Sequence, residues 1–376
     1  MAVSFPRPEG AAIRRNWIFV RIETDEGICG VGEATTEFHE MAVIAMIKEH
    51  FAPLLTGCDP TQITRAFQTM RRLFWWRDGV VASSAISGIE QALWDITGKA
   101  CGLPVYKLLG GEVRDRVRLY ARTDLGLADE EAEIEAALQE GFSGFKTGVG
   151  KYHDPYDETK QVEVAVDLYH RLRQASGPEI ALMIDCLGNF SLPAAHRLID
   201  GLRDVKMLFI EEPVVAETPR QLVELRRAFP GERIAAGERL TSRWGVREWL
   251  EVGAVDVLQP DICHCGGIGE LMRIAAAAEV YNVPLAPHNP YGPVAFAANV
   301  HACAAMQNFL ILEHWRDHLF FSKAQKVGVQ VRDGCAQLDD RPGLGVDLDW
   351  EFIAKHPYQP CQTFQFRDRD GGLASI

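Results

Sequence analysis

The chain has 376 residues, of which 47% are hydrophobic and 24% are charged, and it carries a formal net charge of -13 with a pI near 5.4. This composition is typical of a folded globular protein large enough for one large domain and one smaller domain. The acidic balance disfavours binding to nucleic acid or to an anionic membrane, because both need a basic footprint. The expected partner is therefore a small molecule.

The cysteines and the terminal segment bear on the compartment. Nine cysteines are scattered through apolar segments, which predicts reduced thiols rather than a disulfide framework. Cys263 and Cys265 flank His264, but no second pair stands at zinc-ligand spacing, so we expect no soft-metal centre. No apolar run approaches the roughly 20 residues of a membrane span, and the first residues lack the features of a secretory signal. We therefore expect a cytoplasmic protein.

The first part of the chain, residues 1–115, predicts a small α+β domain. Residues 17–23 (WIFVRIE) are rich in β-branched and aromatic residues, and a DEG turn separates them from ICGVGEA, so a β-hairpin is expected. No strand is expected ahead of this hairpin. Between residues 82 and 100 apolar residues recur at helical spacing, and Gly102 and Pro104 end that pattern. The charged segment VRDRVR marks the boundary with the next domain.

Residues 116–320 contain eight short apolar segments that alternate with amphipathic stretches, which predicts parallel strands joined by right-handed helical crossovers. Eight such units close into a (β/α)₈ barrel of the TIM type. The predicted strands end near Thr123, Thr147, Asp185, Glu211, Glu238, Gln259, His288 and Glu313. An open doubly wound sheet is the alternative, but its glycine-rich phosphate-binding turn is missing after Tyr120. Residues 321–376 are expected to pack back on the barrel and on the first domain.

Three carboxylates, those of Asp185, Glu211 and Glu238, stand at the ends of three successive predicted strands. The carboxyl ends of barrel strands converge on one face, so we expect these side chains to meet. Clustered carboxylates raise one another's pKa unless a cation lies between them. Because no histidine or cysteine belongs to the set, the sequence predicts a Mg²⁺ site, with Mn²⁺ as a substitute, rather than a Zn²⁺ site.

His288 and Asp261 stand at the ends of the seventh and sixth predicted strands and should be neighbours. A carboxylate that holds one imidazole nitrogen fixes the tautomer and leaves the other nitrogen free to act as a base. The sequence therefore predicts a His-Asp dyad beside the metal site.

Several motifs are spread over most of the chain: GVGEA, SAISGIEQALWDITGKACGLPVYKLLGG, FIEEP, AAGERL, VDVLQPD, HCGGI and LAPHNPYGP. Together they resemble the enolase superfamily, specifically its mandelate racemase group and the sugar-acid dehydratases similar to galactonate dehydratase. The resemblance implies that the first domain caps the barrel and that the protein is a homo-oligomer. It also implies that Glu313 is a hydrogen-bond partner for the developing enolate, and that Lys146 contacts the substrate carboxylate.

The resemblance also suggests contacts from outside the strand ends. Residues 35–41 fall where the group has a mobile capping loop, which makes His39 a candidate substrate contact. Glu212 follows a metal ligand and, by strand alternation, is expected to point elsewhere. Further candidates for hydroxyl contacts are Arg77, Arg122, Tyr152, His153 and Asn189.

Two positions depart from the group's pattern. Racemases and lactonising members place a second lysine where this chain has Gly148, and galactonate dehydratases place a histidine acid where it has Leu187. The expected reaction is Mg²⁺-dependent removal of the C2 proton from an aldonate or aldarate, followed by loss of the C3 hydroxyl on the same face, with His288 serving both steps.

Three other functions remain open from the sequence. A sugar-lactone cycloisomerase is the main alternative, because it needs only one base. A racemase or epimerase ranks lower, because Gly148 leaves the opposite face without an evident base. A catalytically silent barrel ranks lowest, because it would be expected to have lost a metal ligand or the dyad.

Overall fold

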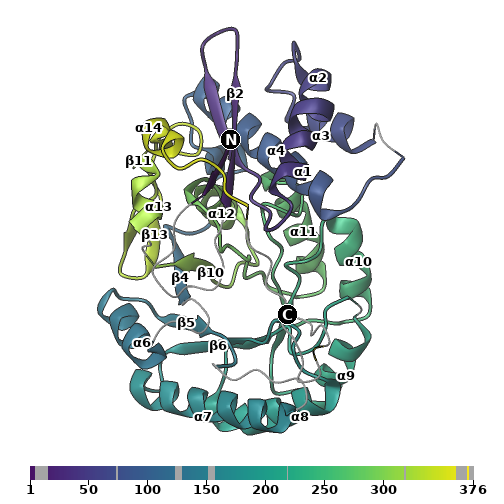
Figure 1. Cartoon of the computed structure of the whole chain (residues 1–376), viewed down its shortest axis with the longest axis vertical. Coiled ribbons are helices and arrows are strands. Elements are labelled where there is room, and N and C mark those ends of the chain that lie inside the picture. Colours follow the sequence, from purple (N-terminus) through teal and green to yellow (C-terminus); the bar gives the residue numbers. More distant parts are fainter. Residues whose placement is uncertain are drawn as a thin grey trace.

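The computed structural model describes residues 1–4, 16–72, 75–122, 129–150, 157–217, 219–316, 319–360 and 371. An α+β unit rests on one end of a barrel of parallel strands, and helices surround the barrel (Figure 1). The sequence-based expectations for Thr123, Tyr152 and His153 fall outside the described residues.

An antiparallel sheet opens the chain. Its strands, in spatial order, are β1 (Ala2–Ser4), β2 (Asn16–Glu23) and β3 (Cys29–Glu33). The predicted hairpin of β2 and β3 is confirmed. The expectation that no strand precedes it was wrong, because β1 pairs with β2 and places Ala2 opposite Ile18. Three residues are too few to show an alternating pattern, so sequence periodicity could not reveal this strand.

The helices of this unit pack against the sheet. They are α1 (Glu40–Ala45), a π-helical turn (Met46–Phe51), α2 (Ala52–Leu55), α3 (Ile63–Arg72), α4 (Val80–Cys101) and α5 (Val105–Leu108). Helix α4 matches the predicted helix and ends at Gly102, whose φ of 66° is left-handed. A Cβ at Gly32 would lie 1.9 Å from the Gly88 carbonyl oxygen, so this glycine of β3 allows the backbones of strand and helix to meet.

The barrel contains seven regular strands. They are β4 (Arg116–Arg122), β5 (Gly144–Thr147), β6 (Ala181–Asp185), β7 (Phe209–Glu211), β8 (Ile234–Ala236), β9 (Val257–Leu258) and β10 (Leu312–Trp315). These strands pair in parallel, and β10 closes the barrel by pairing with β4. The seventh position is filled by residues 284–288, which form only isolated bridges to the neighbouring segments. Pro284 and Pro287 explain this irregularity, because proline cannot donate to a strand ladder.

Helices cover the outside of the barrel. They are α6 (Glu130–Gln139), α7 (Glu158–Ser176), α8 (Leu192–Leu202), a 3₁₀ turn (Arg203–Val205), α9 (Arg220–Ala228), α10 (Arg243–Glu251), α11 (Ile268–Val280) and α12 (Pro293–Ala305). Outward-facing strand residues such as Leu182, Ile184 and Leu258 join these helices in the main hydrophobic core.

A separate apolar layer fills the inside of the barrel. Its buried members are Tyr120, Met183, Phe209, Ala235, Val257, Ala286 and Ile311, which come from seven of the eight strand positions. On β5 the corresponding residue is Gly144, where a Cβ would lie 3.0 Å from the Cβ of Tyr120. This layer seals the barrel below the carboxyl ends of the strands, and the next inward residue of each strand must therefore lie at the mouth.

The segment after the barrel contacts both units. Its elements are α13 (Leu319–Lys323), β11 (Gln325–Val327), β12 (Val331–Arg332), β13 (Cys335–Gln337), β14 (Asp347–Leu348) and α14 (Trp350–Ala354). Strand β13 pairs antiparallel with β4, and the Ser4 amide donates to the carbonyl oxygen of His356. The division of the chain at residues 115 and 320 stays a prediction.

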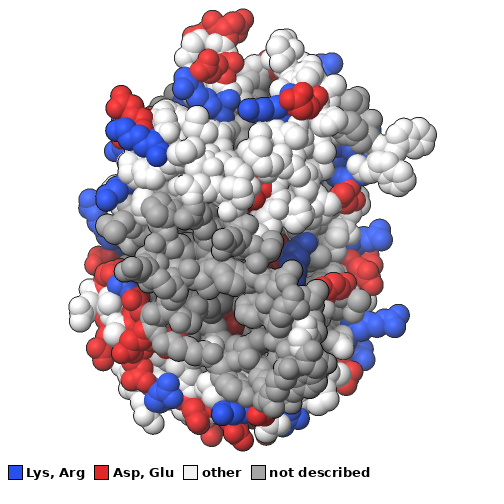
Figure 2. All heavy atoms as spheres, viewed as in Figure 1, with Lys and Arg blue, Asp and Glu red and all other residues white. Residues whose placement is uncertain are grey.

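The outer surface carries charged side chains of both signs. Figure 2 shows acidic and basic side chains interspersed around the edge of one face. All eight cysteines that lie within the described residues are free thiols. In the described part of the chain, no helix is long and apolar enough to cross a membrane.

Two buried carboxylates of the first unit hold the starts of barrel helices. Glu90 on α4 accepts from the Ile268 and Gly269 amides at 2.7 and 2.8 Å, at the first turn of α11. Glu33 on β3 accepts in the same way from the Gly292 and Ala295 amides at the start of α12. The first amides of a helix lack partners within the helix, so these carboxylates satisfy them and join the two units.

The pKa of Glu90 gives a testable pH dependence of stability. Burial raises this pKa from its usual value of 4.5 to about 7, and the amide donors oppose the rise. Between these two values the folded state binds more protons than the unfolded state, so stability falls as the pH rises. In Glu90→Gln, which cannot ionise, the decrease in Tm between pH 5 and pH 8 should be smaller than in the wild type. Thermal unfolding would be measured at both pH values, with Glu279→Gln on the exposed side of α11 as the control. If both variants showed the same decrease in Tm as the wild type, the prediction would be wrong.

Candidate active site

Eight positions form a ring at the carboxyl ends of the barrel strands, each two residues beyond the interior apolar layer. We call this ring the mouth layer. Its members are Arg122, Lys146, Asp185, Glu211, Gly237, Gln259, His288 and Glu313. Side chains of a strand alternate between its faces, so these residues point into the barrel. Six of the eight belong to ionisable residue types, which makes the mouth layer the most highly charged part of the barrel interior.

Lys146 on β5 lies at the centre of the acidic side of the mouth layer. Its buried ammonium group donates to Glu211 Oε1 and Oε2 at 2.9 and 2.7 Å, and it lies 3.2 Å from Glu313 Oε1 and 3.9 Å from Asp185 Oδ2. Burial opposes the charge, but the surrounding carboxylates hold the pKa of Lys146 well above its usual value. Lys146 is therefore a buried cation that neutralises the carboxylates around it.

The two carboxylates nearest Lys146 differ in their electrostatics. Burial raises the pKa of Glu211 to about 8, and Asp185 and Glu238 add to this effect while Lys146 opposes it. Burial would raise the pKa of Glu313 as well, but Lys146, Arg122 and His288 hold that pKa below its usual value. Glu313 is therefore ionised and can only accept hydrogen bonds.

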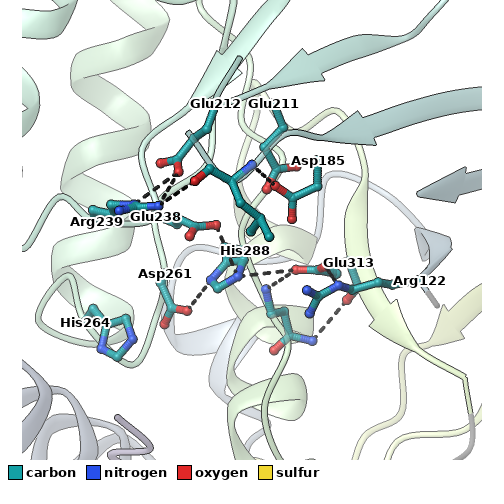
Figure 3. Close-up of polar contacts among 12 residues, drawn as sticks. Arg122, Asp185, Glu211, Glu212, Glu238, Arg239, Asp261, His264, His288 and Glu313 are labelled. Atoms are coloured by element: carbon teal, nitrogen blue, oxygen red, sulfur yellow. Dashed lines mark hydrogen bonds and ion pairs between the residues drawn. The ribbon is translucent and has the colours of Figure 1, made fainter. Parts of the chain in front are cut away.

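His288 and Asp261 lie in contact, as the sequence predicted. The Nδ1 atom of His288 is 2.7 Å from Asp261 Oδ2, and this carboxylate also accepts from the Cys263 amide through its other oxygen, at 2.6 Å. The opposite ring nitrogen, Nε2, faces Glu238 Oε2 at 3.3 Å and Glu313 Oε2 at 4.0 Å (Figure 3). Only 11% of the His288 side chain is exposed.

The pKa of His288 depends on these carboxylates. Burial lowers it, but Glu238, Asp261 and Glu313 together raise it to about 10. Glu238 contributes the largest rise, so neutralising Glu238 would shift the pKa of His288 back toward the range in which histidine acts as a base.

The three predicted metal ligands fit a hard divalent cation by their chemistry. Each comes from a different strand end, all are carboxylates, and Asp185 and Glu238 both act electrostatically on Glu211. Within the described residues, however, no three acidic, histidine or cysteine side chains already stand as a closed ligand set. Two contacts keep the carboxylates from closing into a ligand set. Lys146 holds Glu211 on one side, and His288 contacts Glu238 on the other. Binding a cation would require these two contacts to loosen.

Leu187 and Glu212 complete the rim beside Asp185. Leu187 has a left-handed φ of 54°, and its amide donates to Asp185 Oδ1 at 3.1 Å. Glu212 is buried and pairs with Arg239 at 3.0 Å, and the expectation that it points elsewhere than the metal ligands stays a prediction. Burial and the neighbouring Glu238 raise the pKa of Glu212 to about 9, although Arg239 lowers it.

The other predicted contacts are distributed unevenly. Arg122 is a member of the mouth layer, with Nε 3.4 Å from Glu313 Oε1. Asn189 is half-buried and bridges through its backbone to Val214. His39 is exposed at the start of α1, with Nδ1 3.1 Å from the Glu37 carbonyl oxygen, and Arg77 is exposed just before α4. Arg122 thus lies among the charged groups of the mouth layer, whereas His39 and Arg77 lie on the surface of the first unit, and the roles of all three as substrate contacts stay predictions.

Sequence reasoning missed Asn289 and Glu33. The Asn289 amide donates to Glu313 Oε2 at 2.8 Å, and its side chain donates to the Glu313 carbonyl oxygen at 3.0 Å, which ties the seventh strand position to β10. Glu33 accepts hydrogen bonds from amides at the start of α12, and this helix begins only a few residues after His288. The available signals were the motif HNP, which contains Asn289, and the motif GVGEA, which contains Glu33. Neither motif indicates the partner of its residue, because the partners are distant in the sequence.

Comparison with known proteins gives consistent matches over nearly the whole chain. The N-terminal domain of the mandelate racemase/muconate lactonizing enzyme family matches residues 9–110, and the enolase C-terminal domain-like family matches residues 129–352. The D-galactonate dehydratase of Ralstonia pickettii is 40% identical over 371 residues, which cover 95% of this chain and 96% of the relative. The D-galactonate dehydratase of Cronobacter sakazakii is 38% identical over 373 residues, with the same coverage.

Solved structures agree with these matches. An enolase from Agrobacterium radiobacter with sodium and L-malate bound has a TM-score of 0.90 and 31% identity, and the match covers 100% of this chain and 98% of that one. A mandelate racemase/muconate lactonizing enzyme-like protein from Rubrobacter xylanophilus has a TM-score of 0.86 and 33% identity, over 93% and 96% of the two chains.

Proposed function

Because the chain belongs to the mandelate racemase/muconate lactonizing enzyme family of the enolase superfamily, we propose that it is a dehydratase of sugar acids. The substrate would be an aldonate or an aldarate, and the product a 2-keto-3-deoxy acid. The observation that carries this proposal is the His288-Asp261 pair, whose other ring nitrogen, Nε2, faces the carboxylate cluster across the mouth layer. The names of the curated relatives make D-galactonate the first acid to test.

Asp185, Glu211 and Glu238 would hold a divalent cation, for which Mg²⁺ is the best match to three carboxylates. When bound, it would attract the substrate carboxylate and stabilise the negative charge that develops there as the C2 proton leaves. Since Lys146 now pairs with Glu211, this lysine would turn its charge toward the substrate carboxylate once Glu211 has another cationic partner.

His288 would act as the base. Once the charge of Glu238, which does most to raise the pKa of His288, is neutralised, that pKa would fall toward the range of a base. Asp261 Oδ2 would keep the proton on Nδ1, so the lone pair would lie on Nε2, the nitrogen that faces the mouth layer. Nε2 would take the proton from C2, and the electrons of the C2–H bond would move toward the carboxylate, where Lys146 can donate a hydrogen bond. The resemblance implied that Glu313 is a hydrogen-bond partner for the developing enolate, which would need a protonated carboxyl. Beside Lys146, Arg122 and His288 the pKa of Glu313 is lowered, so its role would be to orient these three groups instead.

His288 would also assist departure of the C3 hydroxyl. The side chain of Leu187 cannot supply a proton, and Gly148 places no base at the end of β5. The proton held on Nε2 would therefore pass to the C3 oxygen, and the C3–O bond would break to release water. The resulting enol would take a proton at C3 and lose the proton of its C2 hydroxyl to solvent, which gives the 2-keto acid. Both proton transfers would occur on the His288 face, which makes the elimination syn.

A substrate screen tests this proposal. The purified chain with Mg²⁺ would be incubated with D-galactonate, other aldonates, aldarates and their lactones, and 2-keto products would be detected with semicarbazide. The proposal predicts a 2-keto-3-deoxy acid from at least one acid, and no product when EDTA replaces Mg²⁺. Consumption of a lactone without loss of water would favour the cycloisomerase instead, and no reaction across the panel would contradict the substrate class.

A further inference from the structure

Gln259 stands apart from the other side chains of the mouth layer. It follows β9 directly, and only 1% of the residue is exposed. Within the described residues, neither its amide oxygen nor its amide nitrogen has a hydrogen-bond partner, and no other described side chain has two such buried atoms. A buried amide without partners is costly in the folded protein, because it has lost its hydrogen bonds to water.

The positions around Gln259 explain why the amide is left open. The charged members of the mouth layer pair among themselves, as in the contact of Lys146 with Glu211 and that of Arg122 with Glu313. On the neighbouring strand β8 the mouth-layer position is Gly237, which has no side chain and a φ of 132°. A Cβ there would lie 3.1 Å from the Gln259 backbone nitrogen. Gly237 therefore contributes no side chain to the mouth layer between Glu211 and Gln259, and the side-chain atom nearest to such a Cβ is Leu258 Cδ1 at 3.0 Å.

The chemistry of the amide indicates what it would bind. A glutamine side chain offers an acceptor oxygen and two donor hydrogens, but no charge. A substrate carboxylate is better matched by Lys146 and Arg122, which are cationic. A hydroxyl group both donates and accepts, so it can satisfy both ends of the amide.

We propose that Gln259 is a substrate-contacting residue that hydrogen-bonds a hydroxyl at C2 or C3 of the sugar acid. This assignment rests on the proposed function, in which His288 acts at C2. The Gln259 strand lies next to the seventh strand position, where the Ala286 amide donates to the Leu258 carbonyl oxygen, so Gln259 and His288 face the mouth from adjacent positions. A site built for a hydroxyl discriminates against ligands that lack it, because its buried polar groups are then left unpaired.

The test compares ligands and variants in one cycle. Gln259→Met keeps the size of the side chain and removes both polar atoms. Both proteins also carry His288→Asn, which blocks turnover. Calorimetry with Mg²⁺ then measures the binding of three ligands. These are the sugar acid that the wild type converts fastest and its 2-deoxy and 3-deoxy analogues. With Gln259 present, we expect the parent acid to bind about tenfold more tightly than one of the analogues. With methionine, that preference should fall below about threefold.

Each result decides the assignment. If Gln259→Met weakened the binding of all three ligands equally, or left their binding unchanged, the assignment would be overturned. A lower Tm of Gln259→Met would also overturn it, because it would show that the amide has a structural partner. Gln337→Met on β13, outside the mouth layer, serves as the matched control and should leave the preference unchanged. If the wild type converts no acid, the proposed function fails and the assignment fails with it. Conversion by the wild type with an unchanged preference would overturn the assignment alone.

Discussion

Replacing His288 with asparagine is expected to lower kcat by about 10²- to 10⁴-fold, the range in which a positioned general base contributes to catalysis. The change removes Nε2, the ring nitrogen that faces the carboxylate cluster, while asparagine can still donate a hydrogen bond to Asp261. The variant should also fail to form the 2-keto product that carries solvent deuterium at C3. Steady-state rates together with NMR of the substrate in D₂O measure both effects.

A matched control separates catalysis from folding. His301→Asn makes the same change at a buried histidine of α12, whose ring stacks on Tyr106 at 5.6 Å. This variant is expected to lose stability but to keep its activity per folded molecule. If His288→Asn retained a near-normal rate, the base would have to be another group, and the proposed mechanism would be wrong.

Replacing Lys146 with methionine is expected to have two large effects. Without added metal the protein should lose about 3–5 kcal/mol of stability, because Glu211, Glu313 and Asp185 would remain buried without their common cation. Activity should fall as well, because the donor to the substrate carboxylate is lost. Mg²⁺ should raise the Tm of this variant more than that of the wild type, since the cation no longer competes with Lys146 for Glu211.

The Mg²⁺ response distinguishes this account from a general effect of removing a buried lysine. Lys99→Met is the control, because Lys99 pairs with the buried Asp95 at 2.7 Å in the first unit. That variant should also be destabilised, but Mg²⁺ should not restore it. Equal Mg²⁺ responses of both variants and of the wild type would contradict a cation site beside Lys146.

Much of the barrel could be predicted because its determinants are local. Each strand is a short apolar run and each helix an amphipathic stretch, so the alternation is visible along the chain. The acidic residues at strand ends follow from the same pattern, since the barrel brings all carboxyl ends to one face. The seventh strand position was predicted at His288, yet its prolines prevent a regular strand.

The contacts that the sequence did not reveal depend on side chains that meet across long sequence separations. The pairing of Lys146 with Glu211 spans 65 residues, and that of Glu33 with the start of α12 spans about 260. Neither residue has a local pattern that names its partner. Gln259 is a related case, because only the packed structure shows that a polar residue within the motif VLQPD is buried without a described partner.

The central claim is that His288 takes the C2 proton of a sugar acid and that the C3 hydroxyl then leaves. The most direct test is to incubate D-galactonate with the purified chain and Mg²⁺ in D₂O, and to examine the product by NMR and mass spectrometry. The account predicts loss of one water, a keto group at C2 and a single deuterium at C3, with no product from His288→Asn. Deuterium at C2 of an otherwise unchanged acid would contradict it, because the protein would then exchange or invert C2 without eliminating water.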